Sequence, residues 1–225
     1  MIDHPIVLLS RAKDIIQTEG VWLLFVRSFH YFKRFIFLYR NYYLYKHSIQ
    51  ERDEVYFLPN IRDFIFEIVS SNKEADQLAV EMGYDFRKIF SDARNRLDRG
   101  AVAFCVFVDN EIAFIGWVAM NKEAKNTFDP APYYVDFANS EACMGGAYTV
   151  QKYRGKGLMA YVYYKAYEYL RDKGITISRN AVTVDNVISQ KVLSKFSLEI
   201  YAQVRYIRIL WWTYWKEMPF TKVAN

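Results

Sequence analysis

Two patterns of hydrophobic and polar residues meet between residues 50 and 60. After residue 60, short alternating runs rich in β-branched and aromatic residues are interleaved with segments of helical spacing. Before it, residues 21–45 are strongly apolar, and on a helical wheel Arg27, His30 and Arg34 fall on one narrow stripe. This pattern predicts a basic amphipathic helix with a wide apolar face over residues 21–45.

The later pattern predicts an α/β domain. We expect strands at 63–69, 101–108, 112–120, 143–150, 175–184 and 198–212, and helices at 74–82, 86–97, 158–173 and 187–196. Asp109-Asn-Glu111 is typical of the turn of a β-hairpin. Residues 121–140 contain Pro130 and Pro132 and are expected to form a loop.

The two patterns predict two parts, a basic aromatic helical extension at residues 1–50 and one domain at residues 51–225. The chain carries 30 basic and 25 acidic residues, whereas residues 21–50 contain five basic residues and no acidic one. A helix of this kind packs on its own domain, on a second subunit as in a homodimer, or on a membrane surface through residues 21–45. Nucleic-acid binding is disfavoured, because the aromatic residues follow helix-packing spacing.

Composition removes several classes of protein. The chain is 52% hydrophobic and 24% charged, which excludes a disordered protein. Two cysteines exclude a disulfide scaffold and a four-cysteine zinc site, and we expect no metal. His4, His30 and His47 are the only histidines. Without a visible secretory signal or an uncharged run of 18 residues, we expect a cytoplasmic protein, with the inner face of the membrane as an alternative.

The segment with the clearest chemistry is Gly146–Met159, which reads as a strand, a glycine-rich loop and the start of a long helix. The first amides of a helix are unpaired, and the helix dipole adds partial positive charge there. Gly155 and Gly157 let backbone N–H groups approach an anion closely, and Lys152, Arg154 and Lys156 add charge. The predicted ligand is a pyrophosphate or a similar phosphate group.

Two familiar phosphate loops fit poorly. A Walker loop requires a Lys-Ser/Thr pair that is absent. Gly155-x-Gly157-x-x-Ala160 has the spacing of a dinucleotide fingerprint, but a hairpin precedes it and too few residues follow for further parallel strands.

The sequence Arg154-Gly-Lys-Gly157-Leu-Met159 resembles the coenzyme A loop of the GNAT superfamily of N-acetyltransferases, Gln/Arg-x-x-Gly-x-Gly/Ala. Met159 stands where that motif has a small residue. The Asn-x-x-Ala/Ser element of the family matches Asn186 to Ser189, and Lys195-Phe-Ser-Leu198 stands where Lys-x-Gly-Phe is typical. The resemblance covers residues 60–212. It implies a mixed, mostly antiparallel central sheet with splayed parallel strands at the CoA site.

The resemblance also implies acetyl-CoA, or another acyl-CoA, as co-substrate. Its pantetheine would lie along the strand backbone near Thr149 and Val150. The pyrophosphate would meet the amides of the loop, and Asn186 and Ser189 would face the cofactor. Asn186 alone is equally well explained as a helix N-cap. The loop residues expected to bind are Arg154, Gly155, Lys156, Gly157 and Leu158.

The acid–base groups are less well defined by the resemblance. Glu141, just before the motif strand, is the candidate base, and Asp136 is a second candidate. A backbone N–H near Val150 would stabilise the oxyanion. The family's usual tyrosine acid falls at Leu193, so Tyr201 is a hypothesis for that role. Cys143 is expected in the core, because direct transfer needs no acyl-enzyme.

The resemblance thus identifies residues 51–225 as a GNAT-like acyltransferase domain that transfers an acetyl group from acyl-CoA to a primary amine by direct attack. The acceptor is open, and a cell-envelope or amino-sugar amine is a hypothesis motivated only by the extension. The alternative is a non-catalytic acyl-CoA-binding or membrane-peripheral interaction module.

Overall fold

The computed structural model describes residues 37–220, which form two compact units. The larger unit contains residues 42–203 and 218–220, and the smaller unit contains residues 37–41 and 204–217. The residue range 1–36, which includes most of the predicted extension, lies outside the described residues.

The larger unit is built on a sheet whose strands follow the order β2-β3-β4-β5-β6-β1. Among the pairings of these six strands, only β5 with β6 is parallel. The predicted mixed, mostly antiparallel sheet is therefore confirmed. The strands are β1 (Phe37–Ser48), β2 (Phe64–Val69), β3 (Val102–Val108), β4 (Glu111–Ala119), β5 (Glu141–Thr149) and β6 (Ile177–Thr183).

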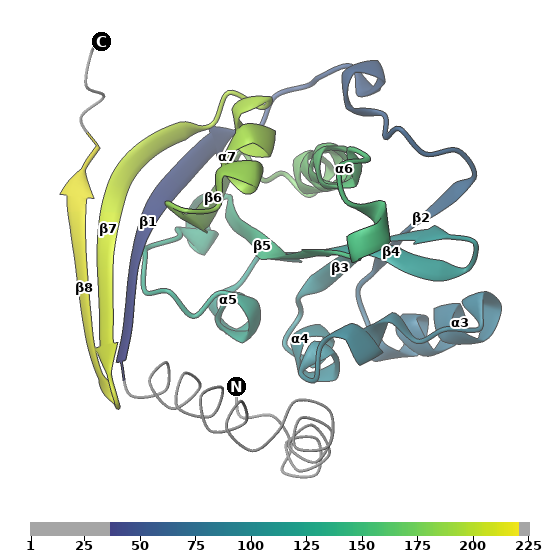
Figure 1. The fold of residues 1–225 in the computed structure, drawn as a ribbon, viewed down its shortest axis with the longest axis horizontal. Coiled ribbons are helices and arrows are strands. Elements are labelled where there is room, and N and C mark those ends of the chain that lie inside the picture. Colours follow the sequence, from purple (N-terminus) through teal and green to yellow (C-terminus); the bar gives the residue numbers. More distant parts are fainter. Residues whose placement is uncertain (1–36, 221–225) are drawn as a thin grey trace, which may run out of the picture. The chain divides into compact units, whose positions relative to one another are not determined.

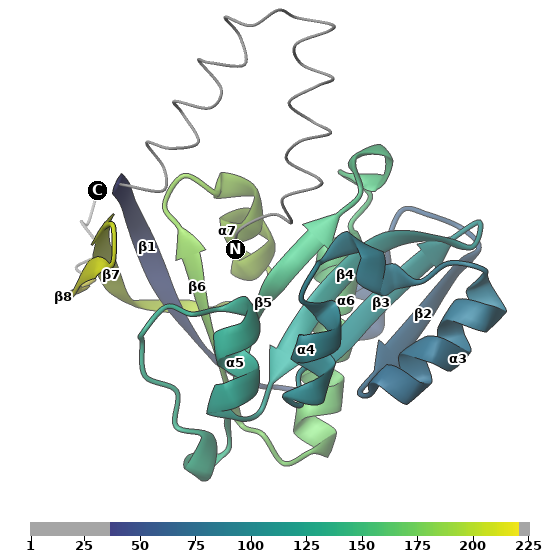
Figure 2. The ribbon, with the colours of Figure 1, turned by 90° about the horizontal axis from the view of Figure 1, so that it is seen from below.

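Helices cover both faces of this sheet. Figure 1 shows α6 and α7 on one face and α3, α4 and α5 on the other, and Figure 2 shows the latter three in front of the strands. The connection between β5 and α6, residues 150–157, contains the 3₁₀ turn Gln151–Tyr153 and ends at the start of the long helix. The α-helices of this unit are α3 (Asn72–Met82), α4 (Ala93–Asp98), α5 (Lys122–Phe128), α6 (Leu158–Asp172) and α7 (Val187–Ser194).

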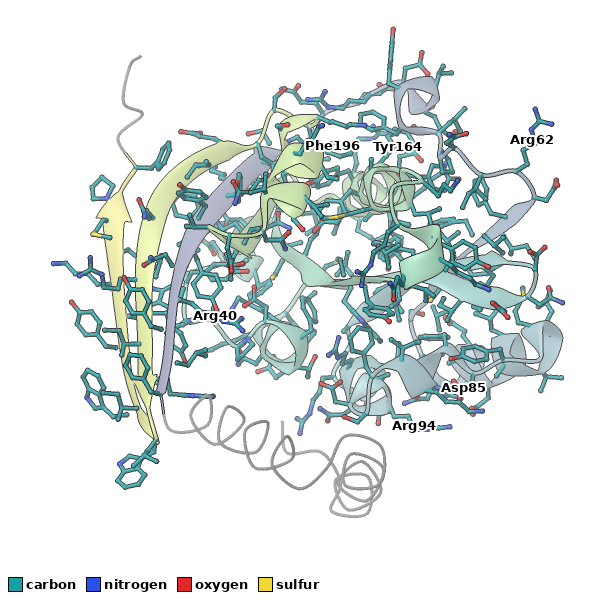
Figure 3. All side chains as sticks on the ribbon, viewed as in Figure 1. Arg40, Arg62, Asp85, Arg94, Tyr164 and Phe196 are labelled. Atoms are coloured by element: carbon teal, nitrogen blue, oxygen red, sulfur yellow. The ribbon has the colours of Figure 1, made fainter. Side chains whose placement is uncertain are left out.

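The core of the larger unit forms where α6 packs on the sheet. The residues Leu158, Val162, Ala166 and Leu170 recur every four positions along α6 and form an apolar stripe, and all four are buried. Phe57 stacks on Tyr164 of α6 and on Phe196, which follows α7, with ring centroids 5.3 and 4.5 Å apart. Figure 3 shows both of these partners on the α6 side of the sheet. Stacked rings of this size fix how α6 and α7 meet.

One helix and one loop predicted from the sequence differ from the structure. The expected helix 86–97 is divided into the 3₁₀ turn Phe86–Ile89 and α4. The expected loop 121–140 contains α5, because Asn121 caps a helix there and its Oδ1 accepts a hydrogen bond from the Ala124 amide at 2.8 Å. Pro130 and Pro132 lie after the end of this helix, so they indicate a loop only for the segment that follows α5.

The predicted helix over residues 21–45 is wrong for residues 37–45, which belong to β1. Residues 42–48 of β1 pair antiparallel with β6, from Tyr42↔Thr183 to Ser48↔Ile177. Leu44 and Tyr45 are buried on opposite faces of this strand. The apolar residues spread widely around the helical wheel because they serve two faces of a strand inside a sheet, where aromatic side chains are favoured.

The smaller unit contains the first residues of β1 and most of the two strands that follow in the sheet order, which is β1-β7-β8. The strand expected at 198–212 is β7 (Glu199–Ile209), and β8 (Trp212–Pro219) follows it after two residues and was not expected. Among the described helices, none combines the length and the hydropathy that a membrane span requires.

Candidate functional site

The parallel strands β5 and β6 separate after three residue pairs. Glu141, Ala142 and Cys143 pair with Ile177, Ser178 and Arg179, and the register ends there. Asn180 Nδ2 then donates a hydrogen bond to the Met144 carbonyl at 2.9 Å, which joins the strands where they begin to part. The remainder of β5 pairs only with β4, so the edge of β5 that faces β6 is left open toward Thr149.

A β-bulge lies in this open part of β5. The register with β4 shifts between Ile115 and Trp117, and Gly146 has a φ of +58°. A Cβ on Gly146 would lie 3.0 Å from Trp117 and 3.1 Å from Arg96 Nη1, so glycine is required both by conformation and by space. The bulge redirects the last residues of β5 toward the loop that precedes α6.

The last part of the β5–α6 loop presents backbone amides, from Gly155 to Leu158, that donate to no backbone carbonyl of the described residues. Gly155 and Gly157 both have positive φ, and Gly157 is the N-cap of α6 without any side-chain cap bond. The Asn60 amide donates to the Lys156 carbonyl at 2.8 Å, which holds the loop from the side away from its amides. An uncapped helix start with two adjacent glycines is suited to an anion.

A cavity of about 670 Å³ opens beside this loop and between α6 and α7. Among residues 37–220, its lining includes four basic side chains, Arg154, Lys156, Lys191 and Lys195, and no acidic one. The apolar part of the lining includes Met159 and Val192. A concave site with this charge and an uncapped helix start suits a ligand that carries several phosphates on an apolar stem.

Eight of the nine predicted cofactor-binding residues line this cavity. They are Thr149, Arg154, Gly155, Lys156, Gly157, Leu158, Asn186 and Ser189. Asn186 is at the same time the N-cap of α7, since its Oδ1 accepts a hydrogen bond from the Ser189 amide at 3.1 Å. The two interpretations of Asn186 are therefore compatible.

Val150 is the exception. It is not part of the lining, and its amide donates to the Ala113 carbonyl at 3.0 Å. This amide is committed to β4 and is not free to stabilise an oxyanion. The Arg154 amide is also engaged, with the Gln151 carbonyl at 3.2 Å, so the loop offers its amides from Gly155 onward.

The charge around the loop differs from the prediction at three positions. Lys152 lies outside the lining and forms an ion pair with Glu111. Lys191 and Lys195 take part instead, from α7 and its C-cap. Their spacing of four residues, which is visible in the sequence, places both lysines on one helix face. This spacing points to the cavity only once α7 is known to flank the loop.

Glu141 lies at the opposite end of β5 from the loop. Arg179 donates to its carboxylate from Nε at 2.5 Å and from Nη2 at 2.7 Å, and the Asp136 amide donates at 2.9 Å. Burial alone would raise the pKa of Glu141, but these hydrogen bonds outweigh it and hold the pKa below its ordinary value. The structure does not bring Glu141 or Asp136 to the cavity lining.

Tyr201, the hypothetical acid, joins the same cluster. The Arg179 guanidinium lies 5.0 Å from the centre of its ring. The two predicted catalytic residues thus meet each other through Arg179 and not at the loop. Leu193, where the family has a tyrosine, is fully buried in the core.

Cys143 is buried beside Tyr133, whose hydroxyl lies 3.0 Å from its Sγ. Burial, with the nearby Asp129 charge, raises the pKa of the Cys143 thiol far above its ordinary value. A thiol in this state is a core group, as the sequence suggested. In the described part of the chain, no cluster of three or more potential metal-ligating side chains of the His, Cys, Asp or Glu type is found.

Comparison with known sequences relates the C-terminal part of the chain to acyltransferases. Residues 132–219 match the family described as aralkyl acyl-CoA:amino acid N-acyltransferase, C-terminal region. The match includes β5, the loop, α6 and α7. A search of curated proteins gives no significant match.

Solved structures show a similar fold. A glucosamine N-acetyltransferase region of a fungal multi-domain β-N-acetylglucosaminidase is 11% identical, with a TM-score of 0.50, 80% of this chain covered and 22% of the other. A GNAT-family putative acetyltransferase from Novosphingobium aromaticivorans is 14% identical (TM-score 0.45; 76% and 65% covered). A Drosophila protein is 11% identical (TM-score 0.45; 84% and 58% covered). This chain therefore spans less than two thirds of the length of each, and the likeness concerns the fold.

The resemblance to the GNAT superfamily is confirmed by the family match and by the fold. Residues 132–219 are thus similar in sequence to an acyl-CoA:amino acid N-acyltransferase family, and the fold resembles that of a GCN5-related N-acetyltransferase region.

Proposed function

We propose that this protein transfers an acyl group, most simply acetyl, from acyl-CoA to a primary amine. The observation that supports this best is the cavity beside the uncapped start of α6, whose described lining has four basic side chains and no acidic one. In this proposal the pyrophosphate of CoA meets the amides of Gly155 to Leu158, and Lys191 and Lys195 approach the phosphates from α7.

The open edge of β5 suits the pantetheine part of the cofactor. Its amide groups need backbone partners, and no described strand pairs with the β6-facing edge of β5 between the Asn180 bridge and Thr149. A second cavity of about 500 Å³, lined by Arg52, Tyr56 and Lys195 among others, adjoins the first through Lys195. Its lining combines the exposed ring of Tyr56 with the cations Arg52 and Lys195 and the carboxylate of Asp53, and in this proposal the ring meets the nucleotide end of CoA.

The proposed reaction is a direct attack. The amine nitrogen bonds to the thioester carbon, the carbon–sulfur bond breaks, the amine loses one proton and the CoA thiolate takes one up. In this proposal the amine reaches the thioester as the free base and its proton leaves through water. The rate should therefore rise with pH until the acceptor amine is deprotonated.

For the acceptor we propose a small primary amine, with amino acids as the first class to test, since the matching family is named for them. A cell-envelope or amino-sugar acceptor remains the alternative suggested by the basic segment 21–36. Acyl-CoA as co-substrate suits a cytoplasmic protein. A homodimer is a further proposal that depends on the same segment.

A second candidate function is an acyl-CoA-binding module without catalysis. The burial of Leu193 and the ion pair of Glu141 favour it, because both leave the cavity without the acid–base groups of the family. Binding and turnover must therefore be measured separately.

The test begins with calorimetric titration of acetyl-CoA into the wild type and into Lys191→Glu, Lys195→Glu and Lys122→Glu variants. Lys122 is an exposed basic residue on α5 and provides a matched change of charge away from the cavity. We expect each cavity variant to lose at least tenfold in affinity at low salt, and the control to bind like the wild type. Equal binding by all four proteins, or none by a folded wild type, contradicts the proposed site.

Turnover is then followed as release of CoA thiol with a panel of amino acids, amino sugars and polyamines. Acceptor-dependent release that the Lys191→Glu variant loses supports the enzyme. Binding without release from any acceptor supports the non-catalytic module.

A further inference from the structure

The turn between β7 and β8 ends in four exposed apolar residues. β7 ends at Ile209 and β8 begins at Trp212, so Leu210 and Trp211 alone form the connection. Trp211 is 88% exposed and Trp212 is 52% exposed, while Ile209 and Leu210 are each 43% exposed. We call these four residues the hairpin tip. All four belong to the smaller unit.

The composition of the hairpin tip does not follow from the needs of the turn. Leu210 has a φ of +53°, a conformation in which a two-residue hairpin turn favours glycine or asparagine. A branched apolar side chain is strained there and gains little burial in return. The leucine is therefore better explained by something that the tip contacts than by folding of the hairpin.

The surroundings of the tip are aromatic and basic. Trp212 and Tyr214 stack on one side of β8, with centroids 6.1 Å apart and planes inclined by 17°. Arg205 and Lys216 are exposed on the two strands. The described part of the smaller unit has four basic residues and one acidic residue, Glu217, which accepts a hydrogen bond from Trp215. The basic residues are Arg40, Arg205, Arg208 and Lys216.

We propose that the hairpin tip inserts into the interfacial region of an anionic lipid bilayer. Tryptophan and tyrosine prefer that region because their rings combine an apolar body with a polar group, and basic residues on the strands would then meet the headgroups. A stable protein partner requires about 800 Å² per side, which a two-residue turn with its neighbours does not offer. In the sequence, residues 21–36, just before β1, carry three basic residues and no acidic one. Their net charge therefore has the same sign as that of the strands beside the hairpin tip.

The proposal is tested by co-sedimentation of the full chain with vesicles of phosphatidylcholine alone or with 30% phosphatidylglycerol, a probe composition on the order of that of anionic membranes. A Trp211→Ser/Trp212→Ser variant should lose at least fivefold in binding to the anionic vesicles. Val80→Ser is the matched control, because Val80 is an apolar residue of the larger unit with 85% exposure. Binding of the wild type should also weaken as salt is raised.

Leu210→Gly separates the contact from folding. Glycine relieves the strained φ, so this variant should unfold at an equal or higher temperature than the wild type and yet bind anionic vesicles more weakly. The proposal is overturned if the folded wild type does not bind anionic vesicles, or if the tip variants bind as well as it does. It is also overturned if the tip variants differ from the wild type in sedimentation-equilibrium mass, since the tip would then serve self-association.

Discussion

Arg179 of β6 holds Glu141 of β5 by two hydrogen bonds, of 2.5 and 2.7 Å, at the end of the sheet where these strands still pair. The two side chains are largely buried, with relative exposures of 16% and 7%. This pair clamps the parallel strands on one side of the point where they separate. The open edge of β5 beyond that point is the feature on which the proposed cofactor site depends.

Glu141→Gln should destabilise the protein by about 3 kcal/mol at pH 7, because breaking one side of a buried pair leaves Arg179 without a charge partner. Since the folded state holds the Glu141 pKa below its ordinary value, the stability it provides is complete at neutral pH. It is lost as the pH falls below the ordinary value of 4.5 toward the folded pKa. Urea unfolding of wild type and variant from pH 7 to pH 3.5 measures both effects.

The difference between the two proteins should shrink on acidification, and a constant difference would contradict the assignment. The same variant also tests catalysis. If Glu141 were the general base, acyl transfer by the folded variant would fall about a hundredfold or more, whereas a clamp predicts a change of only a few fold in kcat under conditions where the variant is folded.

Gly155→Ala should weaken acetyl-CoA binding at least tenfold. Both Gly155 (φ +76°) and Gly83 (φ +69°) are left-handed, and a Cβ at either position meets no atom within 4 Å. Alanine therefore costs about 1 kcal/mol of backbone strain at each site. The two positions differ in what lies beside the new methyl group. At Gly155 it lies in the cavity lining, next to the amides proposed to bind phosphate, and at Gly83 it does not.

Gly83→Ala, at the C-cap of α3, is thus the matched control. Thermal unfolding should show similar losses for the two variants, and calorimetry should show lost affinity for Gly155→Ala alone. Unchanged affinity of the Gly155 variant would place the phosphates elsewhere.

Because His47 is buried in its neutral form, the free energy of unfolding should decrease as the pH falls from neutral to mildly acidic values. Burial, and next the charge of Arg52, lowers the pKa of His47 from 6.5 to about 4, and the His47 ring lies 4.5 Å from that of Tyr167. As the pH falls from 6.5 to about 4, the unfolded chain takes up a proton that the folded protein does not. Stability is therefore full above that window and falls within it, by at most about 3 kcal/mol.

His47→Gln should lose stability at pH 7.5 but should change less than the wild type between pH 7 and pH 5. Urea unfolding at intervals of half a pH unit measures the two slopes. Parallel slopes would show that other groups carry the acid sensitivity.

The candidate site was predicted best where its signal is local. Three features depend only on neighbours in the sequence: the Arg154–Met159 motif, the hairpin of β3 and β4, and the helix α6. The structure has each of them at the expected residues. The resemblance of the motif to a known family, and not periodicity, led from an anion-binding loop to acyl-CoA.

Lys191 and Lys195 could not be assigned in advance, because their part in the cavity depends on how α7 packs beside α6. Glu141 was misjudged as a neighbour of the chemistry for the converse reason. Its position along β5 was nearly right, but only the parallel register with β6 shows that Arg179 faces it.

By itself the sequence determined most of the elements between residues 63 and 209 and the glycine-rich loop before α6, and it predicted an anion there, because backbone freedom and charge at a helix start are local properties. The tertiary structure alone decided that residues 37–48 enter the sheet as β1. The same apolar residues satisfy a helix or a two-sided strand, and pairing with β6 joins residues that lie from 129 to 141 positions apart. Hydrogen bonds to a distant partner, which no local pattern records, resolved that ambiguity.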